Sequence, residues 1–420
     1  FRWFGGTSPG CSSSHFHEGS LTSWPKITAR AAASGRLALS ATIPGGCPKG
    51  GTVRIDRIVL RLVEMPLKFR FRTSFGETTA KRFLLVETRS GGLSGWGECV
   101  AEEGPFYSPE TIDSARSALS KFLAPIVLGR DLGSAEELDR LAVRVRGNRM
   151  AKGALETALR DLFARAEGVP LARSLGGTRT EIEVGVSLGL QSTVEETVEV
   201  VARHVAQGYR RVKLKIEPGA DVDRVAAARE AFPDLPLTVD ANAAYTLETA
   251  GPLLALDAFG LDYVEQPLHH EDLVAHAELA RRLSTPICLD ESIRSAADAA
   301  AAISLGACRV INVKIGRVGG HGETLRIHEA AMRAGVPLWC GGMLESGVGR
   351  AHNIAAATLP GFSKPGDTSS SSRYFEEDLV EPRPEATDGL MPVPGGPGIG
   401  VAVRKDVLAR FTQETLELEA

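Results

Sequence analysis

Five charged residues recur at an almost constant spacing in the central part of the chain, and each closes a short apolar run. They are separated by 25, 25, 25 and 24 residues and stand at Lys215, Asp240, Glu265, Asp290 and Lys314. A repeat of this length holds one strand, one helix and two loops, so the spacing predicts consecutive βα units. Parallel strands with right-handed crossovers close readily into a barrel, and barrel enzymes work at the carboxyl ends of the strands. We therefore expect the five charges to converge at one mouth, where a partner or a metal offsets the cost of their burial.

Lysine is rare in this chain and is concentrated at the proposed mouth. The sequence holds 11 lysines against 37 arginines, and three of the lysines are Lys213, Lys215 and Lys314. Alternation along a strand turns Lys213 and Lys215 to one face, and the same holds for Asp240 with Asn242. Lysine can lose its proton in a protein when its pKa is lowered, whereas arginine cannot. Lysine at these positions indicates proton transfer rather than simple anion binding.

The composition is typical of a large enzyme that acts on a small molecule. The net charge of −4 and the lack of a polybasic run give no reason to expect a nucleic-acid partner. No stretch approaches the roughly 18 apolar residues that a membrane span needs, so no membrane partner is expected. The six cysteines form no C-x-x-C pair, which indicates reduced thiols and a cytoplasmic location.

Composition and periodicity divide the chain into four segments. Residues 1–52 are rich in Ser, Gly, Ala and Pro and are predicted to be a disordered extension, either a targeting segment or an artefact of the gene start. Residues 53–178 show strand-like alternation followed by helical patterns, which predicts a small α+β domain. Residues 179–371 hold the barrel units. Residues 372–420 are predicted to pack back on the first domain.

The acidic members of the spacing pattern favour a hard divalent ion. Asp240, Glu265 and Asp290 end three neighbouring strands, and ligation by oxygen alone favours Mg²⁺, with Mn²⁺ as a substitute, over zinc. The histidines are scattered and form no competing cluster. A metal flanked by lysines on separate strands indicates abstraction of a proton next to a carboxylate, through an ene-diolate.

The motifs around these residues together resemble the enolase superfamily, muconate-lactonising subgroup, in its o-succinylbenzoate synthase / N-acylamino acid racemase branch. The resemblance rests on Lys213-x-Lys215, Val239-Asp240-Ala-Asn242, Glu265-Gln-Pro267, Asp290-Glu-Ser292, Lys314-x-Gly-Arg-x-Gly-Gly320 and Gly341-Gly-Met-Leu-Glu-Ser-Gly347. It implies a modified TIM barrel, (β/α)7β, with residues 53–178 as an N-terminal α+β capping domain. It also implies a homo-oligomer, and an octamer is one assembly that it suggests.

The resemblance further implies roles for individual residues. Asp240, Glu265 and Asp290 would be the Mg²⁺ ligands, and Lys215 with Lys314 the acid/base pair. The substrate contacts implied are Lys213, Asn242, Ser187, Gly342, Arg317, Phe75 and Tyr107. All of these except Lys213 have a structural alternative: a turn residue for Asn242, a solvated loop cation for Arg317, close backbone packing for Ser187 and Gly342, and core aromatics for Phe75 and Tyr107. Arg317 follows Lys314 by three residues, so its charge is expected behind the lysine, where it would lower the pKa of that lysine.

Two reactions fit this branch. If each lysine reaches the α-carbon, an N-acylamino acid such as an N-succinylamino acid is racemised. If a β-hydroxyl leaves instead, one lysine suffices and the reaction is the dehydration that gives o-succinylbenzoate for menaquinone. Muconate cycloisomerisation is less expected because of Arg317, and dipeptide epimerisation because Gly341-Gly-Met343 stands where a D-x-D near the eighth strand is expected. A non-catalytic enolase-fold binding protein is the remote alternative.

Overall fold

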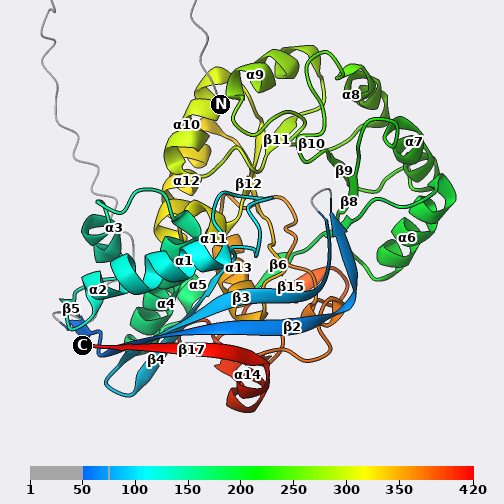
Figure 1. Ribbon diagram of the computed structural model, residues 1–420. Coiled ribbons are helices and arrows are strands. Elements are labelled where there is room, and N and C mark those ends of the chain that lie inside the picture. The colour runs from blue at the N-terminus through cyan, green and yellow to red at the C-terminus, as the bar shows by residue number, and fades with distance from the viewer. Residues whose placement is uncertain (1–50, 74–75) are drawn as a thin grey trace, which may run out of the picture. The chain divides into compact units, whose positions relative to one another are not determined.

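The computed structural model describes residues 51–73 and 76–420, so the 1–52 extension and Phe75 lie outside the described residues, apart from residues 51 and 52. An antiparallel sheet with its own helices comes first in the chain, and a parallel sheet surrounded by helices follows (Figure 1). None of the helices in the described ranges is long and apolar enough to cross a membrane.

The antiparallel sheet has four strands in the order β17-β2-β3-β4. Its strands are β17 (Thr412–Glu419), β2 (Arg57–Thr73), β3 (Gly76–Ser90) and β4 (Leu93–Cys99). Side chains alternate between its two faces. Leu84 of β3 packs with the helices of this domain, whereas Leu85 joins the core of the barrel. Both faces are therefore apolar, and the C-terminal strand β17 completes the sheet by pairing with β2.

Helix α4 joins this sheet to the barrel. The helices of the first domain are α1 (Ile112–Ala118), the π-helical turn η1 (Leu119–Leu123), α2 (Ala124–Val127), α3 (Glu137–Leu141), α4 (Arg149–Ala166) and α5 (Leu171–Ser174), with the short strands β1 (Val53–Arg54) and β5 (Asp131–Leu132) beside them. Helix α4 is buried along most of its length. It lies so close to β4 that a Cβ on Gly95 or Gly97 would stand 2.2 or 2.1 Å from a carbonyl oxygen of the helix. Only glycine permits this approach.

The second sheet contains seven parallel strands paired in chain order from β7 to β13. They are β7 (Val186–Leu188), β8 (Val212–Lys215), β9 (Leu237–Asp240), β10 (Val264–Glu265), β11 (Ile287–Leu289), β12 (Val310–Val313) and β13 (Leu338–Cys340). The predicted α/β class with consecutive βα units is confirmed by this order. Almost every strand residue is buried, as expected for a parallel sheet covered by helices.

Helices surround this sheet (Figure 1). They are α6 (Val194–Ala206), α7 (Val222–Ala231), α8 (Gly251–Ala255) with the 3-10 turn η2 (Leu256–Phe259), α9 (Leu273–Arg282), α10 (Ala296–Leu305), α11 (Ile315–Val318), α12 (His321–Ala334) and α13 (Gly347–Ala357). Thr193, Asp272 and Ser295 each accept a hydrogen bond from the first turn of the helix that they precede. Such N-caps fix where each strand-to-helix loop ends.

An irregular segment, residues 364–367, fills the eighth position between the two edges of the parallel sheet. The amide of Asp367 donates to the carbonyl of Cys340 in β13 (2.9 Å), and the amide of Gly185 donates to the carbonyl of Gly366 (2.7 Å). The eighth-strand position therefore ends at Asp367. Gly341-Gly-Met343, expected near the eighth strand, follows the seventh strand, β13, in the chain and lies beside the eighth position in space, since a Cβ at Gly342 would stand 3.3 Å from the carbonyl oxygen of Asp367.

The remaining elements connect the barrel to the C-terminal strand. They are β6 (Glu181–Glu183) paired with β15 (Leu390–Pro392), β14 (Val380–Glu381) paired with β16 (Ala402–Val403), the 3-10 turn η3 (Ser371–Arg373) and α14 (Lys405–Phe411).

Candidate active site

The five evenly spaced charges lie at the carboxyl ends of five neighbouring strands. Lys215 is opposite Asp240 in the sheet register, and Asp240 is opposite Glu265. Asp290 and Lys314 directly follow β11 and β12. All are buried except Lys215, which is partly exposed. The spacing thus brings the five side chains to one edge of the sheet.

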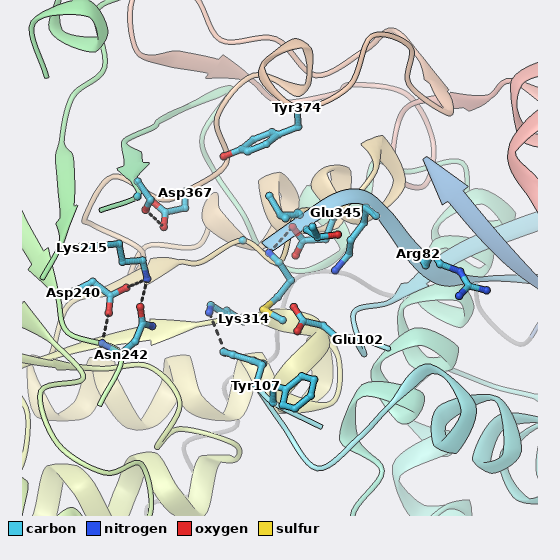
Figure 2. Close-up of a pocket in the computed structure, with 18 of the residues that line it drawn as sticks. Arg82, Glu102, Tyr107, Lys215, Asp240, Asn242, Lys314, Glu345, Asp367 and Tyr374 are labelled. Carbon is cyan, nitrogen blue, oxygen red and sulfur yellow. Dashed lines mark hydrogen bonds and ion pairs between the residues drawn. The ribbon is translucent and has the colours of Figure 1, made fainter. Parts of the chain in front are cut away.

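A cavity of about 370 Å³ opens at this edge, between the barrel and the first domain (Figure 2). Of the predicted site residues, it is lined by Ser187, Lys213, Lys215, Asp240, Asn242, Lys314, Gly342 and Tyr107. Glu265, Asp290 and Arg317 are not among its lining residues and lie deeper. From the first domain the wall includes Lys81, Arg82, Glu102 and Phe106.

The two proposed acid/base lysines are held by different carboxylates, and Figure 2 shows Lys215 with Asp240 and Lys314 with Tyr107. Lys215 Nζ donates to Asp240 Oδ2 (2.7 Å) and to the side-chain oxygen of Asn242. Lys314 Nζ donates to Asp290 Oδ2 (2.8 Å) and to the Tyr107 hydroxyl (3.0 Å). The two ammonium groups therefore reach the cavity from separate strands, each with its own carboxylate.

The pKa values of the three acids shift in different directions because their neighbours differ, and that of Asp240 is lowered by Lys215 and Lys213 against the effect of burial. Burial raises the pKa of Glu265, and the negative Asp240 adds to this, giving about 8. Burial would also raise the pKa of Asp290, but Arg317 and Lys314 outweigh it and hold that pKa below its usual range. Across the described ranges, no three His, Cys, Asp or Glu side chains already stand close enough to hold a metal. Each of the three acids instead forms an ion pair with a lysine.

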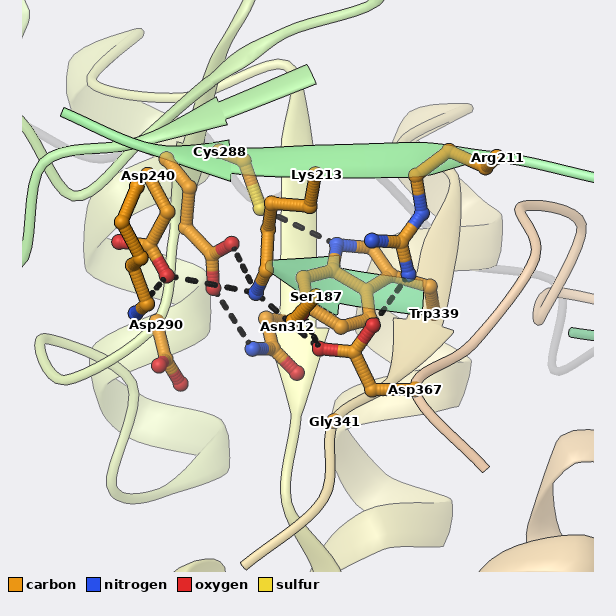
Figure 3. Close-up of polar contacts among 12 residues, drawn as sticks. Ser187, Arg211, Lys213, Asp240, Cys288, Asp290, Asn312, Trp339, Gly341 and Asp367 are labelled. Atoms are coloured by element: carbon orange, nitrogen blue, oxygen red, sulfur yellow. Dashed lines mark hydrogen bonds and ion pairs between the residues drawn. The ribbon is translucent and has the colours of Figure 1, made fainter. Parts of the chain in front are cut away.

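Lys213 sits at the centre of a buried ionic cluster (Figure 3). Its Nζ lies 2.7 Å from Glu265 Oε2, 3.3 Å from Asp240 Oδ2 and 3.1 Å from Asp367 Oδ2. The same nitrogen lies 4.6 Å from the ring centroid of Trp339. Burial alone would lower the pKa of Lys213, but the three carboxylates raise it well above its usual value. Lys213 therefore remains a cation.

Asp367 also belongs to this cluster, although it was not predicted as a site residue from the sequence. It accepts hydrogen bonds from Ser187 Oγ (2.7 Å) and from the guanidinium of buried Arg211 (2.6 Å), besides its contact with Lys213. It also lines the cavity. Asp367 ends the eighth-strand segment, but that segment has no apolar run, so the strand pattern could not reveal it.

Asn312 on β12 was also given no role in the sequence-based site. Its side-chain amide donates to Glu265 Oε1 (2.9 Å), which leaves Glu265 held on both oxygens. A Cβ at Gly341 would stand 2.3 Å from Asn312 Oδ1, so glycine is required there for Asn312 to keep this position. The signal that could have found Asn312 was its place two residues before Lys314, on the same face of the strand.

Asn242 is a turn residue at the end of a strand, and its side chain also contacts polar groups of the site. Its φ of 40° lies in the left-handed region, as suits a turn after a strand. Its side chain also bridges two polar groups, since Oδ1 accepts from Lys215 and Nδ2 donates to Glu291 Oε1 (3.0 Å). Glu291, a buried acid that the sequence-based site left out, has no donor for Oε2 among the described residues.

Arg317 lies behind Lys314, as expected, and does not line the cavity. Its guanidinium donates to Asp290 Oδ1, to the Tyr107 hydroxyl (2.9 Å) and to the carbonyl of Asn312 (3.0 Å). The expected lowering of the lysine pKa does not prevail. Burial and Arg317 both act to lower the pKa of Lys314, but Asp290 outweighs them and raises it.

Comparison with known proteins identifies the family. Residues 56–176 match the mandelate racemase / muconate lactonizing enzyme N-terminal domain, and residues 196–407 match the enolase C-terminal domain-like family. The chain is 56% identical over 360 residues to the N-succinylamino acid racemase of Thermus thermophilus, covering 86% of this chain and 98% of that protein. It is 53% identical over 362 residues to the o-succinylbenzoate synthase of Geobacillus kaustophilus, covering 86% and 96%.

A solved enolase-superfamily structure from Listeria innocua superposes with a TM-score of 0.85 at 44% identity, covering 87% of this chain and 99% of that one. The predicted family and the enolase-like fold class are thereby confirmed. The chain belongs to the mandelate racemase / muconate lactonizing enzyme group of the enolase superfamily, and its relatives include N-succinylamino acid racemases and o-succinylbenzoate synthases.

Proposed function

We propose that this enzyme abstracts the proton α to a substrate carboxylate and acts as an N-succinylamino acid racemase, an o-succinylbenzoate synthase or both. The observation that carries the proposal is the pair Lys215 and Lys314, which line one cavity from separate strands and contact different carboxylates. Relatives that are more than half identical to this chain carry both names.

In the proposed racemisation the two lysines exchange roles. A lysine that has lost its proton takes the α-proton from one face of the substrate, and the electron pair moves into the carboxylate to give an ene-diolate. The other lysine, as an ammonium, donates a proton to the opposite face of the same carbon. The product is the mirror-image N-succinylamino acid, and the two lysines re-equilibrate with water. Lys213, a cation that lines the same cavity, is proposed to stabilise the negative charge that develops on the substrate.

In the proposed dehydration a single lysine moves the proton. It takes the α-proton and then, as an ammonium, returns a proton to the β-hydroxyl, which leaves as water while a carbon–carbon double bond forms. The second lysine then stays protonated and acts as a fixed positive charge beside the ene-diolate. The same two side chains thus serve both reactions, which is why dual activity is expected.

Membership of the enolase superfamily implies a divalent metal, and the residues at the strand ends fit Mg²⁺. Asp240, Glu265 and Asp290 provide only oxygen ligands, as Mg²⁺ prefers. Burial and the repulsion from Asp240 and Asp290 raise the pKa of Glu265, and a bound cation would relieve that repulsion. Oε2 of Glu291 is a further buried oxygen without a donor in the described part of the chain. When bound, Mg²⁺ would stabilise the charge on the substrate carboxylate.

Asp367 argues against dipeptide epimerisation, which needs an acid for the substrate's ammonium group. The carboxylate of Asp367 is already neutralised by Arg211 and Lys213 and accepts from Ser187. The position two residues later is Ser369 rather than a second aspartate. Ser187, Gly342 and Tyr107 remain proposed substrate contacts, and a homo-oligomer remains an expectation from the family.

Replacing Arg317 by glutamine is expected to reduce racemisation more than dehydration, changing the ratio of the two activities by about tenfold or more. Arg317 holds one oxygen of Asp290 while Lys314 holds the other, so its loss frees Asp290 to draw Lys314 out of position. Racemisation needs both lysines, whereas dehydration needs one to move a proton. Chiral chromatography of an N-succinylamino acid and the absorbance of o-succinylbenzoate measure the two rates.

The control for Arg317→Gln is Arg160→Gln, which removes another buried arginine, in α4, that pairs with Glu156 of the same helix and with Glu136 before α3. This control should leave the ratio of the two activities unchanged. Equal losses of both activities in Arg317→Gln would mean that Arg317 supports only the fold or general substrate binding.

A further inference from the structure

One buried cation in the cavity wall has no role in the chemistry described above. Lys81 on β3 of the first domain is 6% exposed and lines the same cavity as Lys215 and Lys314. Among the residues that the structure describes, none accepts a hydrogen bond from its Nζ or forms an ion pair with it. Its positive charge does act on the buried carboxylate of Glu98, whose pKa is raised by burial and lowered by Lys81. A buried ammonium group that donates no hydrogen bond is still costly, so a persistent one in a cavity wall points to a ligand.

Two buried acids, Glu98 and Glu345, already have donors, and Glu102, which also lines the cavity, forms no ion pair with Lys81 in the described part of the chain. The carboxylate of Glu98 accepts from the amide (3.1 Å) and the hydroxyl (2.6 Å) of Ser346. The two oxygens of Glu345 accept from the side chain of Asn353 (3.0 Å) and the amide of Met343 (2.8 Å). The ammonium group of Lys81 is thus left for a molecule that enters the cavity.

The other cations of this wall are already engaged. The guanidinium of Arg82, the next residue on β3, forms ion pairs with Glu64 (3.2 Å) and Glu103. Figure 2 shows it pointing away from the labelled barrel residues. Arg350 donates to the carbonyl of Ser369 (2.7 Å) and lies over the ring of Tyr374. Lys81 is therefore the cation best placed to meet an anionic group of the substrate.

The names of the relatives suggest what that group is. N-succinylamino acids and o-succinylbenzoate share a succinyl chain, which ends in a carboxylate remote from the reacting carbon. An N-succinylamino acid carries two carboxylates, and the one next to the reacting carbon would be held at the barrel mouth. We propose that Lys81 binds the other, the terminal carboxylate of the succinyl group, and so makes the enzyme selective for succinylated substrates. This inference rests on the proposed function.

The test compares two substrates that differ only in the terminal charge. They are N-succinyl-L-methionine and its succinamoyl analogue, in which an amide replaces the terminal carboxylate. In the wild type, kcat/KM for the succinyl substrate is expected to exceed that for the analogue by about ten- to a hundredfold, the range of a charged hydrogen bond. Lys81→Met should remove most of this difference, chiefly through KM, and Lys81→Arg should restore part of it. Arg82→Met, which removes a paired charge from the adjacent position, should keep the difference.

Two results would overturn the inference. One is a wild type that does not distinguish the two substrates, which decides the matter even if Lys81→Met does not fold. The other is a folded Lys81→Met variant that loses the same fraction of its activity on both substrates. That result is expected if Lys81 only balances the negative charge of Glu98. Failure of the proposed function looks different, because the Mg²⁺-loaded wild type would then exchange the α-proton of neither substrate.

Discussion

Replacing Lys215 or Lys314 by alanine is expected to lower racemisation of an N-succinylamino acid by at least about a thousandfold, within the range known for general acid–base groups. Each lysine contacts its own carboxylate, Asp240 or Asp290, so each is expected to serve one face of the α-carbon. Loss of either breaks the two-base sequence. In D₂O each variant is expected to exchange the α-proton of only one enantiomer, and the two variants should differ in which enantiomer that is. Proton NMR on the separate enantiomers measures this exchange.

Lys364→Ala is the matched control for these variants. Lys364 pairs with Asp262 before the start of β10, at the opposite end of the barrel strands, and its loss should leave both activities within about twofold of the wild type. If both active-site variants exchanged both enantiomers at equal rates, the lysines would not flank the substrate and the two-base assignment would be wrong.

Removing divalent metal with EDTA is expected to abolish both activities, and Mg²⁺ or Mn²⁺ should restore them. The expected loss is at least about a thousandfold, because a metal supplies several kcal/mol of stabilisation to the developing charge. Binding should also stabilise the fold, by about 2.7 kcal/mol when Mg²⁺ is at a hundred times its Kd. Thermal unfolding with and without Mg²⁺ measures this without reference to activity.

Asp240→Asn should lose both the activity and the Mg²⁺-dependent rise in melting temperature. Asp262→Asn, a partly exposed acid away from the cavity, should keep both. Full activity of metal-free wild type, or an unchanged response to Mg²⁺ in Asp240→Asn, would contradict the assignment of these ligands.

The strand order and the place of the charged side chains follow from the sequence because both depend on regular spacing. A repeat of about 25 residues is set by one strand and one helix, and the observed register puts Lys215, Asp240 and Glu265 side by side. Alternation along the strands further explains why Lys213 faces the same cluster as Lys215. The metal and acid/base roles of these residues remain predictions that the experiments above test.

Other parts of the site depend on contacts that no local pattern encodes. Asp367 closes the barrel from an irregular segment with no apolar run, so its meeting with Arg211 was not foreseeable. Lys81 comes from an ordinary antiparallel strand and carries no motif. A lowered pKa of Lys314 was predicted from the charge of Arg317, whereas the fold places Asp290 within hydrogen-bond distance of the lysine, and its negative charge raises that pKa instead.

In the proposed activity, one lysine removes the α-proton of a succinylated amino acid and the other returns a proton to the opposite face of the same carbon. The most direct measurement incubates the Mg²⁺-loaded wild type with N-succinyl-L-methionine in D₂O and follows the α-position by proton NMR, with chiral separation of the products. We expect deuterium at the α-carbon of both enantiomers and conversion to the D form. Retention of the α-proton, with no D form produced in the presence of Mg²⁺, would contradict the account.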